Sequence, residues 1–142
     1  IGVGLVGSEM CIRDSLESVS LGKNLISLHP NNYSISLLLS KALFRDKKYD
    51  EAEEILNDIS KKRPTDPFVW YELAEVQGFS NNLIGLHRSR AEYFFLTGRF
   101  EAAIMQLREA SKLAANFFEV SESIRTRMEE IYQTTEALKR MG

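Results

Sequence analysis

The sequence is poor in the residues that carry most protein chemistry. It has one cysteine, two histidines and three prolines among 142 residues. A single thiol excludes a disulfide framework and a multi-thiolate zinc site within this chain. No apolar run approaches the roughly 18 residues that a membrane-spanning helix needs. A net charge of −2 gives no long-range attraction to nucleic acid or anionic lipid. We therefore expect no membrane span and no nucleic-acid partner.

Catalytic and metal-binding motifs are also missing. The sequence has no HExxH, no glycine-rich phosphate loop and no G-x-S-x-G. His29 and His87 fall on different predicted elements, so no nucleophile has a base at usable spacing. The carboxylates of residues 49–58 lie on the outer face of an amphipathic helix, which is ordinarily a solvated surface. We expect no catalytic, metal or cofactor-binding residue here and no enzymatic activity in this chain.

The first fifteen residues differ from the rest. Leu5 to Ser15 read LVGSEMCIRDS and include Cys11. This stretch resembles the translation of an adapter used in transposon-based sequencing libraries, and it lacks the basic start, long apolar core and cleavage site of a signal peptide. We expect residues 1–15 to be a non-native segment and residues 16–142 to be one helical repeat domain, truncated at its N-terminus. The alternative is that residues 1–15 are a native disordered tail.

A repeat organises the remaining chain. Pro30 and Pro64 are 34 residues apart, the period of a helix-turn-helix repeat. Between them, apolar residues at spacings of three and four predict one helix over 33–45 and another over 49–62. The short polar turn between them makes the two helices antiparallel neighbours. The residues predicted to be buried are Ile35, Leu38, Leu39, Ala42 and Leu43 in the first helix, and Ala52, Ile55, Leu56 and Ile59 in the second.

These positions resemble the tetratricopeptide family. Ala52, Leu56, Ile59 and Pro64 fall at its spacing, and Trp70, Leu73 and Ala74 are similar to its W-x-x-L-G pattern, with Ala in place of Gly. Asp66 can cap a helix whose first residue is Pro67. The resemblance implies an all-α fold, a right-handed superhelix of antiparallel helix pairs with a long C-terminal capping helix.

The C-terminal half departs from a regular repeat. Ala103 lies 51 residues beyond Ala52, one and a half periods, so we expect the helix over 83–96 to pack on both of its neighbours. A long helix follows from residue 117 to about 139, with a capping box formed by Asn116 and Glu119. It covers the end of the stack in our interpretation; the alternative is a docking helix for another domain. Its apolar stripe comprises Phe117, Val120, Ile124, Met128, Ile131, Thr135 and Leu138.

The family resemblance also implies a binding groove. The first helix of each pair lines a concave surface that binds peptides or partner helices. Aromatic and arginine residues are the usual anchors of such a surface. Phe44, Phe68 and Phe79 could instead pack against the adjoining helix pair. The candidate groove residues are Leu37, Lys41, Phe44, Arg45, Phe68, Tyr71, Glu75 and Phe79.

A more particular resemblance covers nearly all of residues 16–141. The chain is similar to the C-terminal tetratricopeptide region of periplasmic beta-barrel assembly-enhancing proteases, which are zinc metallopeptidases with an HExxH domain upstream. This resemblance implies a periplasmic, non-catalytic repeat domain whose partners are outer-membrane proteins, their assembly machinery or the protease domain. The alternatives are a stand-alone adaptor or scaffold without a protease domain, and an enzyme with its chemistry in these residues. The matching elements are Trp70, Leu73 and Ala74, then Arg90 to Glu92, Gly98-Arg99, Ala103-Ile104, Ile124-Arg125 and Met128.

Overall fold

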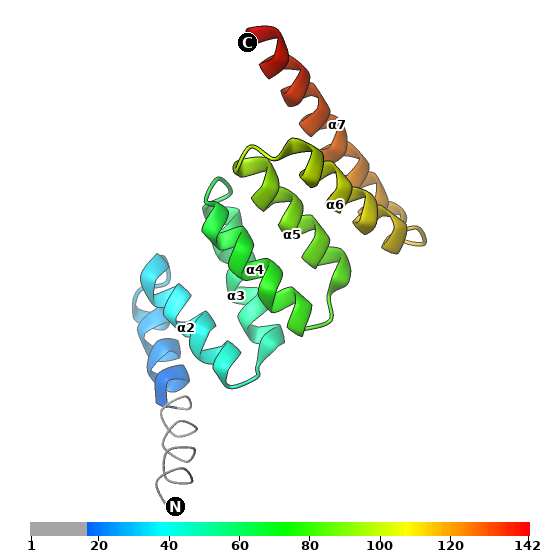
Figure 1. Cartoon of the computed structure of the whole chain (residues 1–142). Helices are drawn as coiled ribbons and strands as arrows, with labels where there is room; N and C mark the ends of the chain where they lie inside the picture. The colour runs from blue at the N-terminus through cyan, green and yellow to red at the C-terminus, as the bar shows by residue number, and fades with distance from the viewer. Residues whose placement is uncertain (1–16) are drawn as a thin grey trace, which may run out of the picture. The chain divides into compact units, whose positions relative to one another are not determined.

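The described part of the chain is helical throughout, with short connecting turns and no strand. This computed structural model describes residues 17–142, so the segment expected to be non-native or disordered, residues 1–15, lies outside the described residues. Residues 17–28 are helical. The predicted all-α, tetratricopeptide-like stack of helices is confirmed. The labelled helices are α2 (Tyr33–Arg45), α3 (Tyr49–Lys62), α4 (Pro67–Phe79), α5 (Leu83–Leu96), α6 (Phe100–Leu113) and α7 (Phe118–Met141) (Figure 1).

The chain forms two compact units, one ending at Lys62 and the other spanning Arg63–Gly142. In the first unit, α2 packs against α3. Ala52 of α3 has no exposed surface, as expected of a small residue that lets two helix backbones approach closely. Leu39, Ala42 and Leu43 of α2 are also buried, so the core of this pair is largely the one predicted from the sequence.

The prediction that Leu38 belongs to this core is wrong. Leu38 is 66% exposed, and Ser40 is buried in its place. The Ser40 hydroxyl donates a hydrogen bond to the Leu37 carbonyl at 2.7 Å, which removes most of the penalty for burying a polar group. Because the hydroxyl is satisfied within its own helix, Ser40 can lie on the buried side of α2, and Leu38 lies outside it. Ile35 and Ile55, also predicted to be buried, are only half-buried.

The second unit contains α4 to α7 packed in chain order, and α5 contacts both α4 and α6. The predicted double role of this helix is therefore confirmed. Ala91 of α5 and Ala103 of α6 have no exposed surface. Small side chains at both positions let α5 lie close to both neighbours. The core around α6 is completed by Ile104, Leu107, Ala110, Ala114, Ile124 and Ile131.

A side-chain cap fixes where α4 begins, and a buried polar contact joins α4 to α5. Asp66 accepts a hydrogen bond from the backbone N–H of Phe68 at 3.0 Å, and α4 begins at Pro67, as predicted. Buried Gln77 and Ser89 satisfy each other, the Ser89 hydroxyl donating to the Gln77 side-chain oxygen at 2.6 Å. Gly85 makes room for this pair, because a Cβ there would lie 2.5 Å from Gln77 Nε2.

Helix α7 has the predicted length but begins differently. The predicted capping box is wrong: the N-cap is Phe117, and no side chain caps the helix. The turn closes with a hydrogen bond from Phe117 N–H to the Ala114 carbonyl at 2.9 Å, which leaves Asn116 one residue too early to cap. Ile124 and Ile131 are fully buried, whereas Phe117 and Leu138 of the same predicted stripe are 56% and 47% exposed.

A salt bridge ties α7 to α5. Arg127 donates two hydrogen bonds to the Glu92 carboxylate, at 2.6 and 2.8 Å, and its guanidinium lies over the Phe95 ring at 4.9 Å. Hydrogen bonding to Glu92 raises the pKa of Arg127 above its already high ordinary value, so Arg127 stays charged at any working pH. The bidentate geometry and partial burial make this pair a stronger link than an exposed surface pair.

Replacing Ala103 by Leu tests the close approach of the helices. The buried site has no room for three more carbon atoms, so we expect Ala103→Leu to lower the free energy of unfolding by about 1–3 kcal/mol or more. Urea denaturation followed by circular dichroism measures the effect. Ala137→Leu makes the same change on the exposed side of α7 and should alter stability by about 0.5 kcal/mol or less. Equal effects of the two changes would contradict the packing described here.

Candidate protein-interaction surface

Helix α4 has one buried side and one exposed aromatic side. Val69 and Leu73 are buried, with 0% and 1% exposure. On the other side, four candidate groove residues share one stripe because their spacings of three and four follow the helix period. The three aromatic side chains on this stripe are 43%, 54% and 57% exposed, in the order Phe68, Tyr71, Phe79. The fourth residue, Glu75, is exposed beside them.

An aromatic row continues from α4 into α5. The Tyr71 ring lies 5.6 Å from the Tyr93 ring, and Tyr93 lies 5.7 Å from Phe94. The guanidinium of Arg99 then stands 5.0 Å from the Phe94 ring centroid, within the range of a cation–π contact. We call Phe68, Tyr71, Phe79, Tyr93 and Phe94 the aromatic surface. It combines rings of two helices of the same unit, with Tyr93 and Phe94 half-buried and Phe94 also packed against the core.

Sequence reasoning missed the α5 part of this surface. Tyr93, Phe94 and Phe95 are consecutive, and their aromatic run was the available signal. Because α5 has neighbours on two sides, residue spacing alone does not tell which of its rings enter the core and which remain accessible. Phe95 packs towards the core and Phe100, whereas Tyr93 extends the row begun by Tyr71.

The remaining candidate groove residues lie on α2, in the first unit. Leu37, Lys41, Phe44 and Arg45 share one side of that helix, where Lys41 and Arg45 are exposed and Leu37 and Phe44 are half-buried. The Phe44 ring packs edge-to-face on Tyr49 of α3, with centroids 5.4 Å apart. The structure thus brings the α2 candidates together on one helix and the α4 candidates together on another, each set within its own unit.

The chemistry of the aromatic surface is that of contact with a polypeptide. Tyrosine and phenylalanine bury large areas at little cost in side-chain entropy, and they are enriched at protein interfaces.

The half-buried His87 is engaged in a helix contact, with its Nδ1 2.8 Å from Gln106 Oε1. Across residues 17–142, no cluster of three or more His, Cys, Asp or Glu residues is placed to hold a metal ion. None of the helices in this same range is both long and apolar enough to cross a membrane.

A family comparison agrees with the helix pattern. A model described as tetratricopeptide repeat matches residues 17–75, which run from the first described helix into α4. The match ends before α5, the helix that packs on two neighbours and departs from a regular repeat. No curated protein matches the sequence. Residues 17–75 therefore match a tetratricopeptide repeat.

Two substitutions on opposite sides of α4, two residues apart, distinguish surface from core. Tyr71 is 54% exposed and its ring packs on that of Tyr93, so Tyr71→Ala should lower the free energy of unfolding by at most about 1.5 kcal/mol. Leu73 is 1% exposed, so Leu73→Ala should cost about 2–5 kcal/mol. Urea denaturation of both variants checks this. A loss at Tyr71 as large as the loss at Leu73 would assign the ring to the core instead of a binding surface.

Proposed function

We propose that this chain is a protein-interaction module that binds a polypeptide on the aromatic surface of α4 and α5. The observation that carries the proposal is the exposure of Phe68, Tyr71 and Phe79 on one side of a helix whose other side is fully buried. Large exposed rings gathered on one stripe cost solubility and mark interaction sites. A tetratricopeptide-repeat region in the same chain supports the same role.

The parent protein is part of the proposal. The order of the motifs in residues 70–128 resembles the repeat region of periplasmic beta-barrel assembly-enhancing zinc metallopeptidases. On this basis the module is the non-catalytic repeat domain of such a peptidase and acts in quality control of outer-membrane protein assembly. Its partners are unfolded outer-membrane proteins, their assembly machinery or the protease domain itself. The protein then resides in the periplasm, and the module has no cofactor of its own.

A stand-alone tetratricopeptide adaptor or scaffold is the second candidate. The family match supports the stand-alone adaptor and the peptidase repeat domain equally, because the match concerns the repeat and carries no information on a protease domain. The two candidates share the aromatic surface and differ in the rest of the gene.

Binding of an unfolded outer-membrane β-barrel polypeptide tests the proposed surface. Fluorescence anisotropy with the labelled polypeptide should show saturable binding, and Tyr71→Ala should raise Kd about tenfold, because aromatic anchors carry much of the binding energy. Arg45→Ala, on α2, reports whether the first unit takes part. The matched control is Phe118→Ala, which truncates a 76% exposed ring on α7 and should leave Kd unchanged. Equal Kd values for wild type and Tyr71→Ala would remove α4 from the binding site.

The genomic sequence upstream of the codon for Leu16 distinguishes the peptidase repeat domain from the stand-alone adaptor. We expect an open reading frame continuous with the repeats that encodes a signal peptide and a domain containing HExxH. A start codon immediately before the repeats, with no such domain, would instead establish the stand-alone adaptor. Long-read sequencing of the source DNA gives this result directly.

A further inference from the structure

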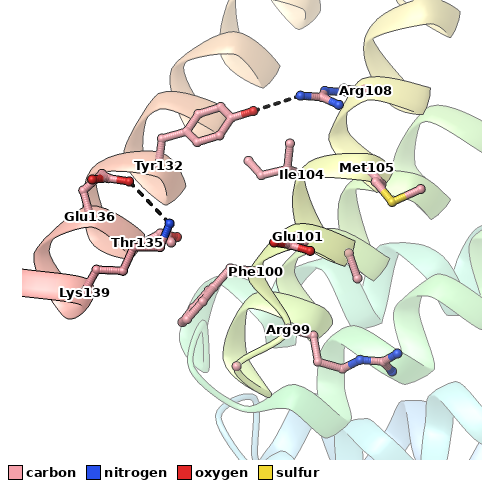
Figure 2. A pocket seen from close by; sticks show the side chains of 12 residues that line it. Arg99, Phe100, Glu101, Ile104, Met105, Arg108, Tyr132, Thr135, Glu136 and Lys139 are labelled. Carbon is pink, nitrogen blue, oxygen red and sulfur yellow. Dashed lines mark hydrogen bonds and ion pairs between the residues drawn. The ribbon is translucent and has the colours of Figure 1, made fainter. Parts of the chain in front are cut away.

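Helices α6 and α7 diverge and leave a wedge-shaped cleft between them. The cleft has a volume of about 870 Å³. It is lined by residues between Gly98 and Arg108, and by Tyr132, Thr135, Glu136 and Lys139 of α7 (Figure 2). Up to Ile131, α7 is held by buried isoleucines and by the Arg127–Glu92 salt bridge. Beyond that point it extends past the start of α6 (Figure 1). We call this feature the α6–α7 cleft.

The cleft offers apolar surface from α6 and a ring from α7. Ile104 belongs to the core and is 6% exposed, so it forms a floor. Met105 is 62% exposed on the adjacent position, and Tyr132 is 42% exposed on the opposite wall. An unbranched methionine adapts its shape to a bound apolar side chain more readily than other residues do. Apolar contact is therefore available in the middle of the cleft.

The charges around the cleft are unbalanced. Three cationic residues line it, Arg99, Arg108 and Lys139, against the two carboxylates Glu101 and Glu136. Glu136 is paired with Lys139 at 3.7 Å. Arg108 donates instead to the neutral hydroxyl of Tyr132 at 3.1 Å (Figure 2), and no carboxylate of residues 17–142 forms a salt bridge with it. Arg99 contacts the Phe94 ring and Lys139 pairs with Glu136, so Arg108 is the cation of the cleft whose side-chain partner is a neutral group.

We propose that the α6–α7 cleft docks an amphipathic helix of a partner protein, one that carries an acidic residue beside its apolar stripe. The apolar stripe contacts Ile104 and Met105, and the carboxylate accepts hydrogen bonds from Arg108 and Tyr132. A helix fits better than a strand because both walls are helices, whose backbone groups are satisfied internally and offer no edge for strand addition. No residue of the aromatic surface lines the cleft, and the proposal does not depend on the proposed function.

Synthetic peptides test this surface in the intact chain. The probe is a fluorescein-labelled peptide as long as α6, with leucine along one helical stripe and glutamate beside it. The matched peptide has lysine in place of every glutamate. Because the chain is net negative, the acidic peptide is not attracted to the protein at large, and its binding reports a local site. We expect saturable anisotropy for the acidic peptide and at least about tenfold weaker binding of the basic one.

Variants locate the site. Arg108→Gln should raise Kd for the acidic peptide about tenfold, because a charge-assisted hydrogen bond is lost. Met105→Asp should raise Kd by about tenfold or more, through loss of apolar contact and added like charge. Arg125→Gln removes an exposed arginine of α7 that does not line the cleft and should leave Kd within about twofold. Circular dichroism confirms that each variant keeps its helix content.

Three results would overturn the proposal: no saturable binding of the acidic peptide, equal binding of both peptides, or equal effects of Arg108→Gln and Arg125→Gln. Tyr71→Ala should not alter binding of the acidic peptide, so a failure here and a failure of the aromatic surface are distinguishable. Binding of the basic peptide alone would assign the cleft a partner of the opposite charge and would also contradict this proposal.

Discussion

The close approach of helices at buried alanines is the constraint on which the rest of the structure depends. Ala91 and Ala103 have no exposed surface, and helix α5 contacts α4 on one side and α6 on the other. A larger side chain at either position would separate the helices and expose the leucines and isoleucines between them. Because small residues allow this packing, the large rings of α4 are not needed to fill the core and are available on the surface.

The same constraint explains the two candidate binding surfaces of the second unit. The aromatic surface exists because α4 buries Val69 and Leu73 on one side and leaves Tyr71 and its neighbours exposed on the other. The α6–α7 cleft lies beside the part of α7 that follows Ile131, the last fully buried residue of that helix. One surface is rich in rings, whereas the other combines apolar side chains with an arginine that has no carboxylate partner within residues 17–142. They suit different partners.

The helices and the buried alanines could be predicted from the sequence because local signals specify them. Spacing places Ala52 and Ala103 in the core, and Asp66 with Pro67 marks the start of α4. The place of Leu38 outside the buried side of α2 could not be predicted, because it depends on burying Ser40, whose hydroxyl bonds to its own helix. The cleft could not be predicted either, since it results from the angle between two helices, and no local pattern encodes that angle.

The central claim is that packing around α5 holds the second unit together, while the end of α7 contributes little. Amide hydrogen exchange, followed by mass spectrometry across the whole chain, tests it most directly. The account predicts the slowest exchange in α5 and in the part of α6 that contains Ala103 and Leu107, and much faster exchange in residues 132–141 of α7. Exchange in α5 as fast as that at the end of α7 would contradict it.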